Sequence, residues 1–337
     1  MPPVDRHRPH PLSRREALAA LSALAGLPGA GRAQPTAFPQ RTISWLVPFA
    51  PGGIADLTAR AVAQGMAPLL GHALVVDNRP GAGSIPASQA VAQAAPDGHT
   101  LLLMSNGHAV APALLRKLPY DAQRDFAPVC LLARFDLALF VPAGSGLRSL
   151  ADLLAQARAR PGRLTLGTVA VGSTQHLAAQ WLLQLAGVDV LSVPYKATPA
   201  LLGALRGGEV DAAVEILGPW LPQLSGGMLR ALAVTAGQRH PDLPDVPTVA
   251  EAGGAALRRY EVSSWNGLAA PARTPPEVLA RLNQAANAAL AQPTVQRALK
   301  ALGVRLQGGP PEALRQLLAA ETRHWAEVAR AAKIEAS

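Results

Sequence analysis

The stretch "VPFAPGGIADLTARAV", residues 47–62, places a Pro-Gly-Gly corner between two different patterns. The residues before the corner, 42–47, have the apolar and β-branched composition of a strand. From residue 54 onward the apolar residues recur at helical spacing, and Gly71 follows the last of them as a C-terminal capping glycine does. The residues expected near the apolar face of this helix are Leu57, Ala61, Met66 and Leu69. The stretch therefore predicts a strand that passes directly into a helix.

Two interpretations of the glycine pair, Gly52 and Gly53, are open. Glycines at the start of a helix let the backbone approach a ligand closely, and the free N–H groups of the first helical turn attract an anion. Glycine is also common at strand-to-helix turns for steric reasons alone. One short motif does not decide between these interpretations.

Strand-like and helical segments alternate along most of the 337 residues. Repeated β-α-β units predict a parallel sheet with helices on its faces, that is, an α/β fold. The length suggests two domains. We expect lobe 1 to comprise residues 34–135 and 253–337, and lobe 2 to comprise residues 136–252. The chain would cross between the lobes twice, near residues 135–141 and 257–268, which makes a hinge.

The first 33 residues have the composition of a secretory signal peptide. Arginines precede an apolar run at residues 17–28, and "GRA" precedes Gln34. This run is shorter than the roughly 20 residues that a membrane-spanning helix needs, and no later segment is long enough either. The pair Arg14 and Arg15 is compatible with the twin-arginine (Tat) route, while Ala17 in place of the usual Phe leaves the Sec route open. We expect an exported protein that does not span the membrane.

The single cysteine, Cys130, excludes an intramolecular disulfide, and no cysteine follows the leader to carry a lipid anchor. The formal charge of +9 includes five arginines and two acids of the leader, so the rest of the chain carries +6. The remaining basic residues are scattered, and aromatic residues make up only 4% of the chain. This composition argues against nucleic-acid binding.

"VGSTQHL", residues 171–177, places a second helix start with free N–H groups in the other expected lobe. Ser173 and Thr174 are good N-cap residues, and capping alone would explain them. Two helix starts, one in each lobe, could also converge on one carboxylate-bearing molecule.

Other motifs give no support for catalysis or for a cofactor. The segment "GAGSIP" at residues 81–86 is not a dinucleotide fingerprint, and neither a P-loop nor a nucleophile elbow occurs. The dispersed histidines His99, His108, His176 and His240 lack metal-ligand spacing. Asp211 and Glu215 would share one face of a strand, as a glycosidase pair would, but Asp211 follows a glycine turn and is expected to serve that turn. We therefore expect neither a metal nor a cofactor.

Nine segments occur in the order seen in one family: "VPFAPGGIADLTARAVA", "VVDNRPGAGS", "APDGHTLLL", "LPYDAQRDFAPV", "GSTQHLA", "VPYKATPAL", "GGEVDAAVE", "LRALAVT" and "PDLPDVPTVAEAG". The chain resembles the solute-binding receptors of tripartite tricarboxylate transporters, the Bug (TctC-like) family, over residues 42–332. The resemblance implies a two-lobed periplasmic binding protein fold, similar to type II, with two interlobe crossover strands. It also implies a soluble periplasmic receptor without catalysis that captures a small organic carboxylate and delivers it to an inner-membrane permease.

The resemblance implies that ligand is held largely by backbone groups at the loops 51–53 and 172–174. The ligand-binding residues that it implies are Phe49, Pro51, Gly52, Gly53, Ile54, Asn106, Gly172, Ser173, Thr174, His176 and Glu215. Four positions depart from the family pattern: Ala50 replaces a proline, Ile54 a small residue, Asn106 a Ser or Thr, and Glu215 an Asp. These departures leave the identity of the ligand open.

Two rival functions remain to be weighed. The effector domain of a transcriptional regulator can share this fold, but it would need a helix-turn-helix where the signal peptide stands. A periplasmic enzyme would need a nucleophile with its base, or paired acids, in the cleft, and the sequence displays neither.

Overall fold

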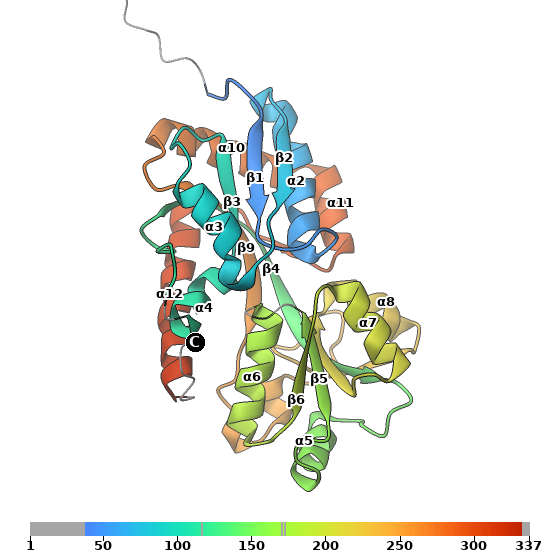
Figure 1. Ribbon diagram of the computed structural model, residues 1–337. Helices are drawn as coiled ribbons and strands as arrows, with labels where there is room; N and C mark the ends of the chain where they lie inside the picture. Colours follow the sequence, from blue (N-terminus) through green and yellow to red (C-terminus); the bar gives the residue numbers. More distant parts are fainter. Residues whose placement is uncertain (1–37, 116, 170, 172, 332–337) are drawn as a thin grey trace, which may run out of the picture. The chain divides into compact units, whose positions relative to one another are not determined.

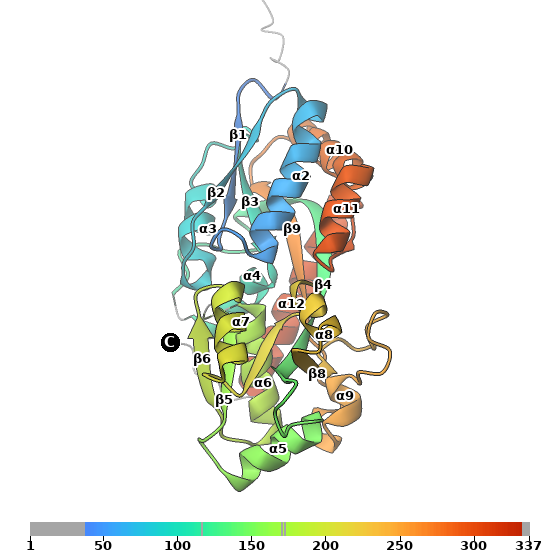
Figure 2. The ribbon, with the colours of Figure 1, turned by 90° about the vertical axis from the view of Figure 1, so that its right-hand side faces the viewer.

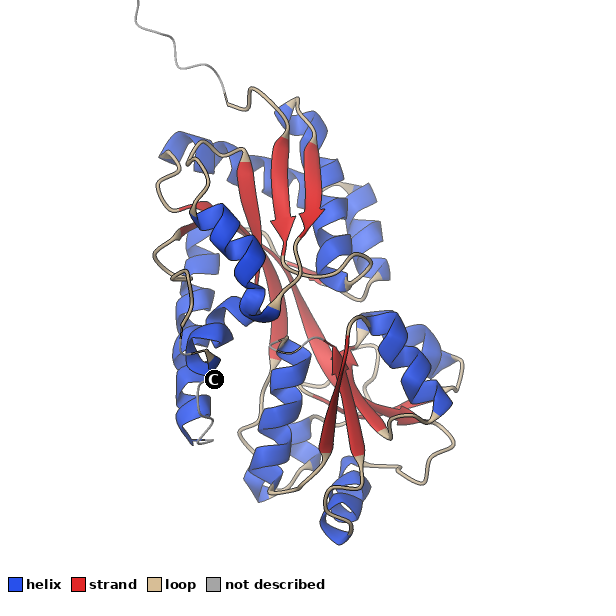
Figure 3. Ribbon diagram, in the orientation of Figure 1, coloured by secondary structure: helices blue, strands red, loops and turns tan. Residues whose placement is uncertain are grey.

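The computed structural model describes residues 38–115, 117–169, 171 and 173–331. The expected signal peptide and residue 172 lie outside this part of the chain. Within it, ten strands form one mixed sheet with the order β2-β1-β3-β9-β4-β7-β5-β6, and β8 and β10 pair with β4 (Figures 1 and 3). Helices cover both faces of the sheet, so the expected α/β class is confirmed.

The first half of the sheet is built around parallel strands, as the β-α-β pattern predicted. Its strands are β1 (Ile43–Val47), β2 (Leu74–Asn78), β3 (Thr100–Ser105), β9 (Ser263–Pro271), β10 (Arg305–Leu306) and the first part of β4 (Phe126–Pro142). β1 pairs in parallel with β2 and β3, and β9 lies antiparallel between β3 and β4. We call the part of the chain built on these strands lobe 1.

The second half of the sheet repeats the parallel arrangement. Its strands are β5 (Thr165–Val169), β6 (Leu191–Tyr195), β7 (Ala212–Ile216), β8 (Leu229–Val234) and the last part of β4. β5 is parallel to β6 and β7, whereas β7 and β8 run antiparallel to β4. We call this part lobe 2.

The long strand β4 passes from one lobe to the other. Asp136 pairs with Ser263 of β9, and the next residue, Leu137, pairs with Ile216 of β7. The hydroxyl of Thr235, just after β8, lies 3.1 Å from the carbonyl oxygen of Leu137 and 2.7 Å from that of Val262. The two expected crossings therefore lie side by side, tied together by one buried threonine.

Helices of lobe 1 include the C-terminal ones. They are α2 (Ile54–Leu70), α3 (Ile85–Ala92), α4 (Asn106–Leu114), α10 (Pro276–Leu290), α11 (Pro293–Ala301) and α12 (Pro311–Ala331). α10 and α11 pack on α2, while α12 packs on α4 and β4 (Figures 1 and 2). None of the described helices combines the length and the apolar character needed to cross a membrane.

Helix α2 ends as predicted but buries a different face. Gly71 adopts φ 74°, and its N–H donates to the carbonyl oxygen of Ala67, as a C-terminal glycine should. Ala59, Val62 and Met66 are buried, whereas Leu57 is exposed, so the prediction that Leu57 lies on the buried face is wrong. α10 and α11 also pack on this helix, at Gly65, where an added Cβ would lie 2.8 Å from Val295 and 2.9 Å from Ala289.

Helices of lobe 2 flank its strands on both sides (Figure 1). They are α5 (Leu150–Ala159), α6 (Thr174–Ala186), α7 (Thr198–Gly207), α8 (Leu221–Ser225) and α9 (Val249–Ala252). The chain also has three short 3-10 turns among its described residues: η1 (Ala82–Ser84), η2 (Gly218–Trp220) and η3 (Ala255–Leu257). Leu201 and Leu205 of α7 pack into one buried cluster with Phe140 and Trp220. α6 covers strands β5 and β7.

The two lobes also touch through aromatic side chains. Trp181 of α6 stacks on Tyr260 with ring centroids 4.9 Å apart and contacts Trp325 of α12 at 5.8 Å. From Phe38 onward the chain accordingly forms one compact unit. The carboxyl ends of β1, β3, β5 and β6 each lead into a helix. The candidate site lies in that region.

Candidate functional site

The glycine corner ends β1 and begins α2. Gly52 has φ 81°, a left-handed conformation that favours glycine, and its N–H donates to the carboxylate of Asp56 at 2.9 Å. Gly53 is the N-cap of α2, in extended conformation, and no side chain caps this helix. The two glycines thus differ: Gly52 shapes the turn, and Gly53 opens the first N–H groups of the helix to the space in front of it.

Asp56 locks this corner in place. Its buried carboxylate accepts hydrogen bonds from Gly52, Arg60 and Asn78. Burial opposes its ionisation, but these hydrogen bonds and the charge of Arg60 outweigh burial and lower the pKa of Asp56. The corner is therefore held by an ionised side chain that lies behind it.

The start of α6 forms the matching corner in lobe 2. The hydroxyl of Ser173 accepts the N–H of His176 at 3.2 Å and donates to the carbonyl oxygen of Val169 at 2.6 Å. Thr174 pairs with Ser264 of β9, with 2.9 Å between the hydroxyl oxygens. This bond joins the start of α6 to a strand of lobe 1, while Ser173 caps the first turn of the helix.

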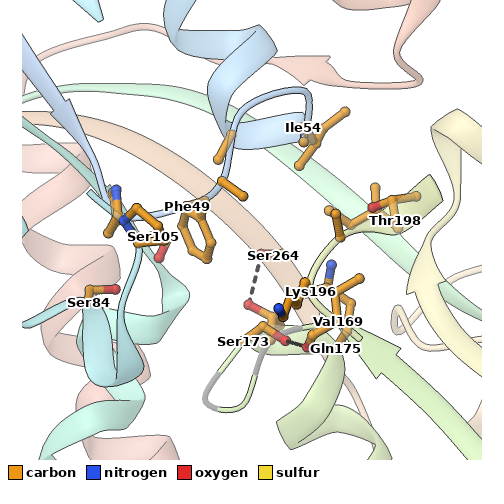
Figure 4. Close-up of a pocket in the computed structure, with 18 of the residues that line it drawn as sticks. Phe49, Ile54, Ser84, Ser105, Val169, Ser173, Gln175, Lys196, Thr198 and Ser264 are labelled. Carbon is orange, nitrogen blue, oxygen red and sulfur yellow. Dashed lines mark hydrogen bonds between the residues drawn. The ribbon is translucent and has the colours of Figure 1, made fainter. Parts of the chain in front are cut away.

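A cavity of about 520 Å³ lies between these two corners. Figure 4 shows Phe49, Ser84 and Ser105 on its lobe 1 side, and Ser173, Gln175, Lys196 and Thr198 on its lobe 2 side. Its apolar lining includes Phe49, Ile54, Phe135, Val169, Val171 and Ile216. Among the described lining residues none is acidic, and Lys196 is the one cation. Lys196 and the helix starts therefore make the electrostatic potential of the cavity positive.

Three further helices begin at this cavity, and sequence reasoning did not place their starts at the site. Ser84 precedes α3, Ser105 precedes α4, and Ala197 precedes α7, and each lines the cavity. The available signal was the position of Ser105 and Tyr195 at the ends of strands, because parallel strands deliver their carboxyl ends to one edge of a sheet. Together with α2 and α6, these helices direct the positive ends of their dipoles toward one space.

The residues implied by the resemblance separate into two groups. Those that line the cavity are Phe49, Gly53, Ile54, Ser173 and Thr174. Those that do not line it are Pro51, Gly52, Asn106, His176 and Glu215, and Gly172 lies outside the described residues. Burial lowers the pKa of His176, which favours a neutral ring.

Glu215 lies behind the wall of the cavity. Its carboxylate accepts hydrogen bonds from Gln175 Nε2 at 2.7 Å, from Thr198 Oγ1 at 3.1 Å and from the N–H of Ile216 at 2.7 Å. Burial raises the pKa of this carboxyl in spite of these bonds. Because Gln175 and Thr198 both line the cavity, Glu215 acts on its surface through them.

Asp211 and Glu215 lie apart and do not form a catalytic pair. Asp211 is exposed and accepts hydrogen bonds from the N–H and the hydroxyl of Thr165, at 2.8 and 2.7 Å. It thus ties the starts of two strands together, as a residue that serves a turn does, while Glu215 is buried at the other end of β7.

A second buried network supports the lobe 1 side. His108 Nδ1 accepts the N–H of Ser105 at 3.1 Å, and His108 Nε2 lies 3.0 Å from the hydroxyl of Ser88. Burial lowers the pKa of His108 to about 4, so the ring is neutral at pH 7. The hydroxyl of Tyr120 donates to the carbonyl oxygen of Gly83 at 2.6 Å. The described residues contain no cluster of three or more potential metal ligands.

The chain is similar to known proteins over most of its length. The model of the tripartite tricarboxylate transporter family receptor matches residues 58–334. A protein from Pseudomonas sp. strain P51, described as a UPF0065 protein in the tcbD-tcbE intergenic region, is 42% identical over 315 residues, which cover 93% of each chain.

Two solved structures are similar over nearly the whole described chain. The periplasmic binding protein BugD is 32% identical, with a TM-score of 0.82 over 89% of this chain and 100% of that one. MatC from Rhodopseudomonas palustris, solved with bound malate, is 36% identical, with a TM-score of 0.80 over 87% of this chain and 100% of that one. The chain shares the fold of these proteins.

Proposed function

Because the chain belongs to the receptor family of the tripartite tricarboxylate transporters, we propose that it is an exported solute receptor for a small organic carboxylate. In this proposal the receptor binds its ligand between the two lobes in the periplasm and delivers it to an inner-membrane permease of the tripartite type. The family consists of solute-binding receptors rather than enzymes.

The observation that carries the proposal is the convergence of helix starts from both lobes on one cavity without an acidic side chain among its described lining residues. Each such N-terminus carries about half a positive charge and several free N–H donors. An anion placed between α2 and α6 would receive hydrogen bonds from both lobes at once. A cation would be repelled there by the helix N-termini and by Lys196, and no carboxylate among those residues would balance it.

The malate bound to MatC supports a carboxylate as the ligand class. For this chain we propose that Gly53 and Ile54 donate backbone N–H groups from lobe 1, and that Ser173 and Thr174 bind the same carboxylate from lobe 2. Pro51 and Gly52 shape the corner, and Gly172 belongs to the opposite loop in this proposal.

We further propose that the lobes close on the ligand about the paired crossings. Thr235 joins the two crossings, so a small rotation there would move the α6 corner toward the α2 corner. The pairing of Thr174 with Ser264 lies on the same path between the lobes. Ligand should then lower the radius of gyration measured by solution scattering.

Native mass spectrometry of the purified receptor tests the ligand class. The expected result is release of a small organic acid, followed by calorimetric binding of that acid to the emptied protein. Asp211→Asn, which changes a charge outside the cavity, should bind it as the wild type does, whereas Gly53→Val should not. Release of an amine or a peptide, or tight binding without compaction in scattering, would contradict the ligand class or the closure respectively.

A further inference from the structure

Two buried polar side chains in the lobe 1 wall of the cavity face each other across a strand pair. Ser105, the last residue of β3, is directly opposite Asn266 of β9. Both line the cavity, and their exposed fractions are only 4% and 1%. The hydroxyl oxygen of Ser105 and the side-chain oxygen Oδ1 of Asn266 have no hydrogen-bond partner among the described residues.

Neighbouring groups fix what each side chain can offer. Asn266 Nδ2 donates to the carbonyl oxygen of Trp265 at 3.1 Å, which leaves Oδ1 as the free acceptor. The N–H of Ser105 donates to His108 Nδ1, and the hydroxyl oxygen of Ser105 faces the backbone of His108 in a capping box, so the hydroxyl proton is left to donate. α4, nine residues long, begins directly after Ser105, so the positive end of its dipole lies at this point.

Buried polar atoms are almost always paired in native proteins, so an unpaired donor beside an unpaired acceptor at a cavity wall indicates a group that satisfies both. A carboxylate would meet repulsion from Asn266 Oδ1. An ammonium group would face the positive end of α4, with no acidic side chain among the described lining residues to balance it. A hydroxyl fits, because it donates one hydrogen bond and accepts another.

We propose that Ser105 and Asn266 form a subsite for a hydroxyl group of the ligand. The ligand hydroxyl donates to Asn266 Oδ1 and accepts from the Ser105 hydroxyl. This inference rests on the proposed function, in which the helix starts of α2 and α6 hold a carboxylate. The receptor then selects hydroxycarboxylates over the same acids without the hydroxyl.

Calorimetric titration with matched pairs tests the subsite: L-malate against succinate, 3-hydroxybutyrate against butyrate, and mandelate against phenylacetate. A site that is built to hydrogen-bond a hydroxyl rejects the analogue that lacks it, so we expect at least one hydroxy acid to bind about 10-fold or more tighter than its partner. Ser105→Ala and Asn266→Leu should each reduce this ratio to nearly one while changing the affinity of the acid without the hydroxyl by less than about twofold.

Thermal unfolding without ligand separates this role from a structural one. Ser105→Ala removes a buried hydroxyl without a full hydrogen bond, but also the N-cap side chain of α4, and because these effects oppose each other the melting temperature should change little. Thr58→Val removes another unpaired buried hydroxyl, in α2 and away from the cavity lining, and should match it in stability while keeping the wild-type ratio.

Each outcome has a definite meaning. Equal binding of both members of every pair, or a ratio that survives in both variants, overturns the subsite but leaves the proposed function standing. Absence of binding by all six acids contradicts the proposed function, and the subsite with it. If one variant does not fold, the other still decides, because Ser105 and Asn266 lie on different strands.

Discussion

Replacing Glu215 tests whether this residue contacts the ligand itself or positions the residues that do. In Glu215→Gln, the amide oxygen can still accept from Gln175 and from the N–H of Ile216, and the amide nitrogen can donate to the Thr198 hydroxyl, which then turns its own hydrogen toward the cavity. In Glu215→Leu, the donors on Gln175, Thr198 and Ile216 lose their acceptor.

The expected magnitudes follow from those three hydrogen bonds. A buried donor left without a partner costs about 1–3 kcal/mol, and Gln175 and Thr198 can partly turn toward water in the cavity. We therefore expect Glu215→Leu to lower the free energy of unfolding by about 2–4 kcal/mol. Affinity should fall by about tenfold or more, since about 1.4 kcal/mol of lost binding energy corresponds to that factor. Glu215→Gln should keep most of both quantities.

The pH dependence of stability gives a second, independent readout. Burial raises the pKa of Glu215 in the folded protein above the value of the unfolded chain. The folded state therefore binds the proton more readily, and ionisation of Glu215 reduces stability as pH rises from the unfolded pKa through the folded one. Below both values this loss is absent. The stability of Glu215→Gln relative to the wild type should thus improve as pH rises from about 4 toward neutrality.

Calorimetric titration with the released ligand, together with unfolding curves from pH 4 to 8, measures all three effects. Asp211→Asn is the control, because it removes a lobe 2 carboxylate that lies outside the cavity. The positioning role is refuted if Glu215→Leu folds and binds as the wild type does. It is also refuted if Glu215→Gln loses as much affinity as Glu215→Leu, since the charge itself would then be needed.

Three further predictions concern the corners and the leader. Gly53→Val should fold, because φ at this position is −80° and an added Cβ would meet only the carbonyl oxygen of Ala50, at 3.7 Å. Calorimetry should nevertheless show affinity at least about tenfold weaker. Gly52→Ala should instead cost about 1 kcal/mol of stability, because Gly52 has a left-handed backbone, and should leave affinity nearly unchanged. Thr174→Val should weaken binding and also lower stability by about 0.5–1.5 kcal/mol, because the buried hydroxyl of Ser264 loses its partner, and wild-type values in both measurements would exclude Thr174 from the site. N-terminal sequencing of the exported protein should begin at or near Gln34, and an intact Met1 on a cytoplasmic product would overturn the signal peptide.

The sequence by itself determined the fold class and two elements of the candidate site. The alternation of strand and helix patterns predicted the α/β class, and the positions of β1, α2, β5 and α6 follow from spacing that is local in the chain. The glycine corner and the Ser173 cap were readable for the same reason, since turn and cap preferences depend on a few neighbouring residues. Local patterns also identified Asp211 as a residue that serves a turn.

Only the tertiary structure decided which residues share the cavity. Gly52 and Gly53 look equivalent in sequence, but the side chain of Asp56 occupies the N–H of Gly52 alone. Ser105 and Asn266 meet only through the register of β3 and β9, which joins distant parts of the chain. Glu215 lies behind Gln175 rather than in the cavity, because the packing of α6 on β7 places the helix start between Glu215 and the open space. Such relations depend on strand register and helix packing between segments far apart in the chain, and no periodicity within a single segment encodes them.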